Sequence, residues 1–210
     1  MNDRLPELLA ARLRETLPGP MVGSRFEARP RFWPDGNSRP PDRRAAAVLV
    51  LLYPQSGQWH LPLTLRPAHL DDHPGQVSLP GGAIEPGESS RRAAVREFHE
   101  ELGGEGAPIE MLGRLSPLYV HASNFLITPW VAATGERPPL APNPAEVDEL
   151  LEVPLEHLLD EDNFGTHQRR HDGHSYTAPH FTWQSHRIWG ATCMILGELV
   201  TVLEGEGVRG

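Results

Sequence analysis

An uninterrupted apolar run, AAAVLVLLY at residues 45–53, sets the first constraint on this chain. Such a run is typical of a strand that is buried on both faces, because a half-buried strand alternates apolar and polar side chains. A Ser56–Gly57 turn follows, and WHLPLTLR at residues 59–66 has the composition of a hairpin partner. We therefore expect the core of the fold to begin with this hairpin.

Further strands and helices alternate along the rest of the chain. The patterns predict short strands and helices in the following order: strand 76–80, helix 89–102, strands 109–120 and 124–133, a strand and then a helix from Pro154, a polar hairpin over 164–186 and a closing helix over 188–205. Pro129 indicates that the strand over 124–133 is an edge strand or contains a bulge, because proline cannot donate to a ladder. Strands interleaved with helices around one core indicate a mixed α/β or α+β fold.

The first 44 residues have a different character. Leucines at helical spacing predict an N-terminal helix ending near Pro18: Leu5, Leu8, Leu9, Leu13 and Leu17. The following residues are rich in proline, which leaves little room for regular structure, so we expect an arm that wraps the core or a flexible connection. The chain is thus divided into this helix and arm, residues 1–44, and one domain, residues 45–205.

The helix predicted over residues 89–102 has an unusual charge pattern. Glu97, Glu100 and Glu101 lie on one side of a helical wheel at positions i, i+3 and i+4, and Arg96 points away from them. Like charges at this spacing destabilise a helix by roughly a few tenths of a kcal/mol per pair. A solvated acidic face is the simple interpretation, and a bound cation is the other.

The segment before this helix, LPGGAIEPGES, favours the cation. Clustered carboxylate oxygens are the ligands that hard divalent cations need, and Mg²⁺ is usually held by a few such ligands together with waters and phosphate oxygens. At Gly81 and Gly82 the backbone can approach an ion, because no side chain obstructs it. The residues alone therefore predict a metal site.

Gly82, Glu88 and the run REFHEELG at residues 96–103 have the spacing of the Nudix box. The chain thus resembles the Nudix hydrolases, which act on a nucleoside diphosphate linked to another moiety. Gly104 departs from the pattern, since an aliphatic residue is usual there. The resemblance implies a mixed β-sheet sandwiched between helices, with a strand, a glycine-rich loop and a helix carrying the site.

The same resemblance implies the metal ligands. Glu97, Glu100 and Glu101 match the metal-binding glutamates of the family, and the Gly82 region matches the segment that supplies a backbone carbonyl. The expected cofactor is Mg²⁺ or Mn²⁺. Glu146 lies where related enzymes carry a further acid near the metal, although an exposed residue at the start of a strand is an equally simple interpretation.

Other matched residues would support these ligands. Arg96 corresponds to an arginine that orients the carboxylates, and Glu88 to a residue that supports the loop; helix capping and surface pairing are ordinary alternatives for both. Either Glu100 or Glu101 would polarise the water that attacks phosphorus. The protein would then contribute mainly positioning and electrostatic stabilisation.

Two further segments resemble the coenzyme A pyrophosphatases within this family. They are LPLTLRPAHLDDHPGQVSLPGG at residues 61–82 and SHRIWGATCMILGELV at residues 185–200. Pro67 and Asp71 depart from the upstream motif, where a small residue and an arginine are usual. The likeness covers most of residues 45–203 and implies hydrolysis of coenzyme A, or of its acyl derivatives, to 3′,5′-ADP and 4′-phosphopantetheine.

Four residues are expected to bind this small nucleotide substrate. Thr64 and Gly75 fall on the upstream motif. Arg66 is the expected phosphate contact, because a guanidinium suits paired oxygens, with a plain surface arginine as the alternative. Phe125 follows the predicted strand over 109–120 and is a candidate for contact with adenine or ribose.

The sequence also allows two alternative functions. Asp71 adds negative charge where an anionic substrate would bind, which favours another nucleoside diphosphate derivative such as NADH, ADP-ribose or a nucleoside triphosphate. A nucleotide-binding module without catalysis is the third hypothesis. The three intact glutamates argue against it, because degenerate modules usually lose them.

The composition limits the kinds of molecule that the protein is expected to bind and where it is expected to work. The formal net charge of −9 has the wrong sign for a protein that binds nucleic acid through its phosphates. The single cysteine, Cys193, lies in an apolar run and is expected to be a buried small hydrophobe rather than a nucleophile. With no apolar segment of membrane-spanning length and no signal-like N-terminus, we expect a cytoplasmic protein. A homodimer is expected only by analogy with relatives.

A group of histidines lies in the predicted hairpin, at positions 167, 171, 174, 180 and 186. Zinc ligands can have such spacings, but the neighbours are loop-like and no cysteine pair accompanies them. We therefore interpret this segment as an exposed polar hairpin, with a substrate phosphate as its possible contact.

Overall fold

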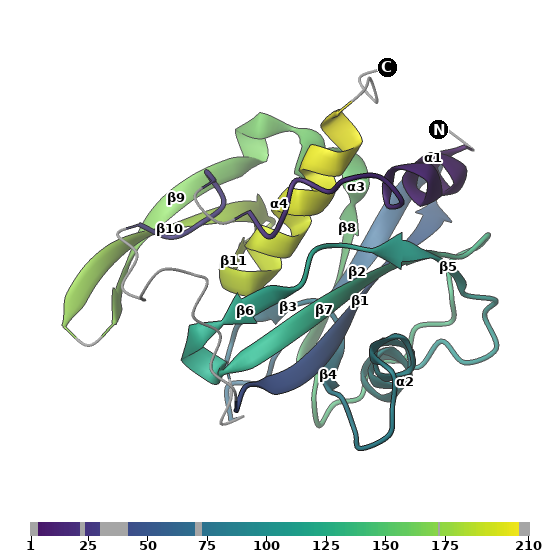
Figure 1. The fold of residues 1–210 in the computed structure, drawn as a ribbon, viewed down its shortest axis with the longest axis horizontal. Helices are drawn as coiled ribbons and strands as arrows, with labels where there is room; N and C mark the ends of the chain where they lie inside the picture. Colours follow the sequence, from purple (N-terminus) through teal and green to yellow (C-terminus); the bar gives the residue numbers. More distant parts are fainter. Residues whose placement is uncertain (1–3, 22–23, 30–41, 70–72, 172, 206–210) are drawn as a thin grey trace.

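The computed structural model describes residues 4–21, 24–29, 42–69, 73–171 and 173–205 (Figure 1). Its helices and strands are, in chain order, α1 (Leu5–Arg12), β1 (Arg44–Gln55), β2 (Gln58–Leu65), β3 (Val77–Ser78), β4 (Gly81–Ala83), α2 (Ser90–Leu102), β5 (Glu110–Arg114), β6 (Leu118–Val120), η1 (His121–Ser123), β7 (Phe125–Ala133), β8 (Glu149–Pro154), α3 (Leu155–Leu159), η2 (Glu161–Asn163), β9 (Phe164–His171), β10 (His174–Trp183), β11 (His186–Trp189) and α4 (Gly190–Glu204).

The larger of the two sheets is mixed and is centred on β1. One edge of β1 pairs in parallel with β7, and the other edge pairs antiparallel with β4 and then with β2. β3 and β8 pair with β2, whereas β5 and β6 pair with β7. The smaller sheet is antiparallel, in the order β11-β10-β9.

Successive residues of β1 enter two different hydrophobic clusters. Leu49 and Leu51 pack with Phe98 of α2, whereas Val50 and Leu52 belong to the cluster that contains residues of α1 and α4. Figure 1 accordingly shows α2 on one face of the sheet and α1 and α4 on the other. The predicted strand buried on both faces and the predicted sheet between helices are both confirmed.

Pro129 is not in an edge strand, so that part of the prediction is wrong. β7 has β1 on one side and β5 and β6 on the other, and Pro129 falls between the stretches paired with β5 and with β6. Its carbonyl accepts a hydrogen bond from the N–H of Leu115 at 2.9 Å. Its nitrogen therefore faces the connection between β5 and β6, where no ladder partner needs a donor. This connection also divides the predicted strand 109–120 into two.

The N-terminal segment packs on the core that α4 covers. Helix α1 ends at Arg12, a turn before the predicted end, and Leu5 and Leu9 are buried in the same cluster as α4. Phe26 is buried there as well, and Arg29 forms an antiparallel bridge with Thr177 of β10. Residues 30–41 of the expected arm lie outside the described residues. The division of the chain at residue 44 stays a prediction.

The three-stranded sheet has two chemically different faces. Pairing places Phe164, Phe181 and Ile188 on one face, where the ring of Phe26 packs against both phenylalanines. The opposite face carries, by the same alternation, His167, Arg169, His180, Arg187 and Trp189. The prediction of a uniformly polar hairpin is therefore wrong for one face. Residues 188–189, predicted as helix, belong to β11.

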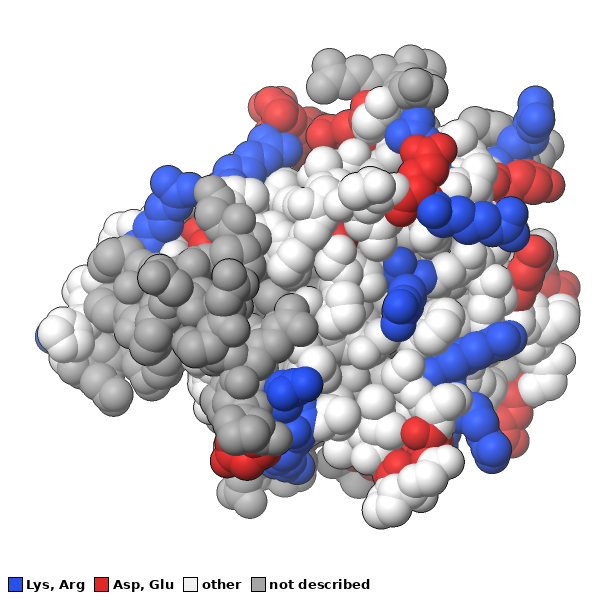
Figure 2. Space-filling model, viewed as in Figure 1, with Lys and Arg blue, Asp and Glu red and all other residues white. Residues whose placement is uncertain are grey.

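Charges of both signs are interspersed on the described part of the face shown in Figure 2, where no block of a single sign stands out. Among the described residues, no helix combines the length and the apolar character needed to cross a membrane.

Candidate active site

The glycine-rich turn before α2 lies directly against the acidic residues of that helix. The N–H of Gly81 donates to Oε1 of Glu101 at 3.2 Å. A Cβ added at Gly82 would lie 2.5 Å from the carboxyl carbon of Glu97, closer than real Cβ contacts. Only glycine therefore lets the backbone of β4 reach the carboxylate of Glu97.

Helix α2 begins with an ordinary cap. Ser89, in the extended conformation, accepts a hydrogen bond from the N–H of Arg92, as serine does at an N-cap. The apolar side of the helix, with Ala94, Phe98 and Leu102, is buried against β1 and its neighbours. This packing fixes the rotation of the helix and thereby the directions of its glutamates.

Arg96 connects the loop to the glutamates. Its Nε and Nη2 donate to Glu88 at 3.0 Å each, and Nη2 also donates to the carbonyl of Ala83 at 3.1 Å. Its Nη1 donates to Glu97 at 2.8 Å and to Glu100 at 2.9 Å. The wheel prediction that Arg96 points away from the glutamates is wrong, because its long side chain folds back over the turn.

Glu88 closes the loop from its other end. It accepts a hydrogen bond from the N–H of Glu85 at 3.2 Å as well as those from Arg96. The hydrogen bonds from Arg96 lower the pKa of Glu88 below its ordinary value. Glu88 and Arg96 thus lie where a loop-supporting acid and a carboxylate-orienting arginine would lie.

The three glutamates differ in their surroundings, although they share one side of the helix. The side chains of Glu97 and Glu100 are 15% and 51% exposed, and Glu101 is 2% exposed. Burial raises the pKa of Glu101 to about 7, and it raises the pKa of Glu97 as well. Burial therefore outweighs the nearby positive charge at both carboxylates, that of Arg96 at Glu97 and that of Arg66 at Glu101.

Glu146 reaches the same place through the loop that follows β7. The N–H of Asn143 donates to the carbonyl of Glu101 at 2.8 Å, and the side-chain amide of Asn143 donates to Glu146 at 3.3 Å. The charge of Glu146 raises the pKa of both Glu97 and Glu101. Glu97 and Glu101 of α2 thus lie against the Gly81–Gly82 turn, and the charge of Glu146 acts on both.

The chemistry of these donors suits a hard divalent cation. Carboxylate oxygens are its preferred ligands, and a cation would stabilise the ionised forms that burial disfavours. Among the described residues, however, no three acidic, histidine or cysteine side chains already form a metal-ligand set. Arg96 contacts both Glu97 and Glu100, so those two carboxylates are held by a guanidinium instead.

The residues expected to bind substrate do not all lie at the same place in the structure. The Thr64 hydroxyl donates to Glu101 at 3.4 Å and lies 3.0 Å from the hydroxyl of Ser78, so Thr64 supports the buried carboxylate. The positive charge of Arg66 lowers the pKa of Glu101, which places it near the same carboxylate. Gly75 has a φ of +65° in the turn that returns the chain to β3 and donates to the carbonyl of Arg66.

Phe125 is not brought beside the glutamates. It pairs with Arg44 at the start of β7, on the edge of β1 opposite to β4, and the Arg44 guanidinium lies 4.2 Å from the centre of its ring. Asp71, whose charge bears on the choice of substrate, lies outside the described residues. Sequence reasoning missed the roles of Ser78 and Asn143, since neither follows from a helical or strand period.

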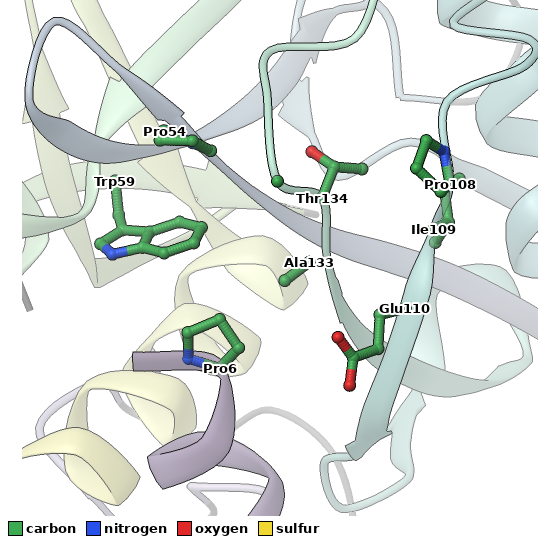
Figure 3. A pocket seen from close by; sticks show the side chains of 9 residues that line it. Pro6, Pro54, Trp59, Pro108, Ile109, Glu110, Ala133 and Thr134 are labelled. Carbon is green, nitrogen blue, oxygen red and sulfur yellow. The ribbon is translucent and has the colours of Figure 1, made fainter. Parts of the chain in front are cut away.

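Another hollow lies away from the acidic site. A cavity of about 570 Å³ is lined by Pro6, Pro54, Trp59, Glu110, Thr134 and their neighbours (Figure 3). Pro54 is at the far end of β1 from Ala47 and Val48, which pair with the Gly81–Gly82 turn. At about 3.3 Å per residue, this separation is on the order of 20 Å. The cavity therefore does not belong to the acidic site.

Comparison with known proteins agrees with the geometry. The model of the NUDIX domain matches residues 43–174. The chain is 37% identical to the human mitochondrial coenzyme A diphosphatase NUDT8 over 91% of its length and 78% of the relative. It is 34% identical to an uncharacterized Nudix hydrolase, NudL, of Photorhabdus laumondii over 75% of this chain and 83% of that one.

Among solved structures, a Nudix hydrolase from M. smegmatis, RenU, has a TM-score of 0.51 at 20% identity, covering 80% of this chain and 90% of the other. This likeness concerns the fold alone. The family match spans more than half of the chain and includes the Gly82 turn, α2 and Glu146. The chain belongs to the Nudix hydrolase family.

Proposed function

We propose that this Nudix hydrolase cleaves the pyrophosphate of coenzyme A, or of its acyl derivatives, to 3′,5′-ADP and 4′-phosphopantetheine. Similarity to the human and mouse coenzyme A diphosphatases, at 37% and 41% identity, supports this substrate. The segments at residues 61–82 and 185–200 support it independently, because they resemble the coenzyme A subfamily outside the shared Nudix box.

The observation that carries the chemistry is the convergence of Glu97, Glu101 and Glu146 on the Gly81–Gly82 turn. Burial raises the pKa of Glu97 and Glu101, so a bound cation would stabilise their ionised forms. We propose Mg²⁺ or Mn²⁺, held by Glu97, Glu100 and Glu101 with a contribution from Glu146. When bound, such an ion neutralises charge on a pyrophosphate and lowers the pKa of a water.

The other residues of the site position these groups. Arg96 holds Glu97 and Glu100 in fixed directions and ties them to the loop through Glu88. Thr64 and the N–H of Gly81 hold Glu101, the carboxylate best placed by burial to accept a proton from the attacking water at neutral pH. Arg66 supplies a positive charge beside Glu101 for a phosphate oxygen.

Product analysis tests the proposal directly. The purified protein is incubated with coenzyme A, with and without Mg²⁺ or Mn²⁺, and the products are separated by chromatography. We expect 3′,5′-ADP and 4′-phosphopantetheine only when the metal is present. No cleavage under either condition would contradict the substrate, and NADH, ADP-ribose and nucleoside triphosphates would then be assayed in the same way.

A further inference from the structure

A second cavity lies between the two sheets, beside the acidic site. Its volume is about 400 Å³, and the end of β2 and the start of β3 line one side of it, with Leu65, Gly75 and Val77. The three-stranded sheet lines the other side, with His167, Gln168, Arg169, Ser185, His186, Arg187 and Trp189. The mechanism proposed above uses none of the residues on this second side.

The described residues that line this cavity carry mainly positive charge. Arg169 and Arg187 project from the same face of the three-stranded sheet, and the Arg169 guanidinium lies 3.9 Å from the centre of the Trp189 ring. Within the described part of the chain, the carboxylate of Glu149 lies 3.2 Å from Nε2 of His186, one of the lining residues. Glu149 is 46% exposed, so solvent screens much of its charge.

One buried donor in the cavity wall is unsatisfied. Among the described residues, Nε of Arg169 is buried and has no hydrogen-bond partner. Leaving a buried donor of a charged group unpaired is unfavourable, so the hydrogen-bonding capacity of this guanidinium is not fully used within the described residues. Stacking on Trp189 holds the guanidinium in place, so the donor is already oriented.

Two histidines on the same face of the sheet as the arginines add hydrogen-bonding groups near the cavity. Nδ1 of His167 lies 3.1 Å from Nδ1 of His180, and His180 is buried next to Gly165. Burial lowers the pKa of both rings, and the positive charge of Arg187 lowers both further. Both shifts favour the neutral rings, and the positive charge of the cavity is assigned to the two arginines.

The framework of the cavity is rigid. The opposite face of the three-stranded sheet is anchored in the core by Phe181 and Ile188, which are 1% and 0% exposed. The Thr192 hydroxyl, in the first turn of α4, donates to the carbonyl of Val77 at 3.2 Å and joins α4 to β3. The positive groups are thus held at a fixed place relative to the main sheet.

The cavity also adjoins the catalytic residues. Leu65 lines it, and the preceding residue, Thr64, donates to Glu101. Successive side chains of a strand point to opposite faces, so the two places lie on opposite sides of β2, and one extended substrate would contact both by passing the end of this strand. Arg66 lies at this end of β2 and near Glu101.

We propose that this cavity binds the phosphomonoester of the substrate, which in coenzyme A is the 3′-phosphate of the ribose. The inference rests on the proposed function and identifies the group that Arg169 and Arg187 recognise. Coenzyme A has three charged phosphorus groups, and its diphosphate is assigned to the acidic site. The pantetheine arm is uncharged and offers nothing to two arginines. A phosphomonoester carries about −1.5 to −2 charges at pH 7, which suits two guanidinium groups.

The test compares coenzyme A with dephospho-coenzyme A, which lacks only this phosphate. The variants are Arg169→Gln and Arg187→Gln, and Arg170→Gln is the control, because Arg170 neighbours Arg169 on β9 but its side chain is on the other face. We expect the wild type to favour coenzyme A by about tenfold or more in kcat/KM. Each of the two variants should lose about tenfold for coenzyme A and nothing for the dephospho form, and Arg170→Gln should behave as wild type.

The failure of this inference differs from the failure of the proposed function. Cleavage of both substrates with equal efficiency, or an equal loss for both in Arg169→Gln, would overturn the phosphate site while the function stands. If neither substrate is cleaved, binding of 3′,5′-ADP and of 5′-AMP, measured by calorimetry, tests the cavity alone. Tighter binding of 3′,5′-ADP that Arg169→Gln abolishes would support the site, and equal binding of the two nucleotides would overturn it.

Discussion

At the scale of single residues, one guanidinium, that of Arg96, contacts some of the carboxylates of the site and not others. Arg96 contacts Glu88, Glu97 and Glu100, whereas Glu101 accepts hydrogen bonds from two neutral donors, the N–H of Gly81 and the hydroxyl of Thr64. The four charges are thus not equivalent. Glu101, the most buried, has its pKa raised to about 7 and is the group most suited to exchange a proton near neutral pH.

Replacing Glu101 with glutamine should reduce kcat by about 10²–10⁴-fold, the range typical of a lost acid–base group, without unfolding the protein. Glutamine keeps an oxygen for the N–H of Gly81 and removes an unfavourable buried charge. Steady-state kinetics and thermal unfolding measure the two effects. Glu105→Gln, an exposed change after the end of α2, is the matched control. Normal turnover in the Glu101→Gln variant would contradict the role of Glu101 in catalysis.

Replacing Gly82 with alanine should impair catalysis more than stability. The added Cβ would meet the carboxylate of Glu97, which is the end of a flexible side chain and can move away. Moving a catalytic group by about 1 Å can lower the rate by about 10²-fold. Kinetics and the midpoint of thermal unfolding check both parts of this expectation.

Gly135→Ala is the control for Gly82→Ala, because a Cβ at Gly135 would meet no atom within 4 Å. A loss of stability without loss of activity in Gly82→Ala would show that the turn has a purely structural role.

At the scale of helices and strands, the sequence predicts most elements because their patterns are local. The apolar run of β1, the period of α2 and the turn at Ser56–Gly57 depend on neighbouring residues, and the structure agrees with them. The edge position predicted from Pro129 was wrong. An inner strand accepts proline here because Pro129 faces the gap between β5 and β6, and this gap depends on tertiary pairing. Arg96 was misplaced because a wheel records the direction of Cβ and not the reach of a long side chain.

Packing between distant elements could not be predicted at all. The Phe26 ring lies against Gly197 of α4, where an added Cβ would be 2.4 Å from the ring. These residues are far apart in the chain, and no period connects them. The fit of this ring is therefore known only from the structure.

Gly197→Ala should destabilise the protein, although alanine favours helices. The helix propensity gained is about 1 kcal/mol, whereas overpacking a buried ring costs about 1–3 kcal/mol. We expect a net loss of about 1 kcal/mol in the free energy of unfolding, measured by denaturant titration. The double variant Gly197→Ala with Phe26→Leu should recover part of the loss. A single variant more stable than wild type would mean that Phe26 does not pack at this position.

At the scale of the whole molecule, buried polar contacts join the layers. Glu198 of α4 is 1% exposed and accepts a hydrogen bond from the N–H of Ser116, in the connection between β5 and β6, at 3.0 Å. Burial raises the pKa of Glu198 above its ordinary value of 4.5. This carboxyl group lies on the opposite face of the sheet from Glu101, so its effect on stability can be separated from catalysis.

Glu198→Gln should make stability less dependent on pH. Since the folded protein holds the proton of Glu198 more tightly than the unfolded chain does, this group makes stability fall as the pH rises above 4.5. Glutamine removes the titration and keeps an acceptor for Ser116. Denaturant midpoints measured at pH 5 and pH 8 should differ less in the variant than in wild type. An unchanged difference would show that Glu198 does not contribute.

The sequence predicts only part of the candidate site, because only some of its residues are close together in the chain. Glu97, Glu100 and Glu101 are close in the sequence, and so their clustering follows from a helix. Glu146 approaches them through hydrogen bonds of the loop at Asn143, and Arg169 and Arg187 meet at a cavity only because two sheets pack together. Sites assembled by tertiary contacts carry no local signal.

The contact between α1 and α4 has a consequence for synthesis of the chain on the ribosome. Leu5 and Leu9 of α1 are 2% and 0% exposed, and they share one cluster with Leu196 and Leu199 of α4. Helix α1 therefore packs against α4, which is synthesised later. Until α4 emerges, these leucines stay accessible to chaperones, and a chain that stops before α4 exposes an apolar surface from which aggregation can begin.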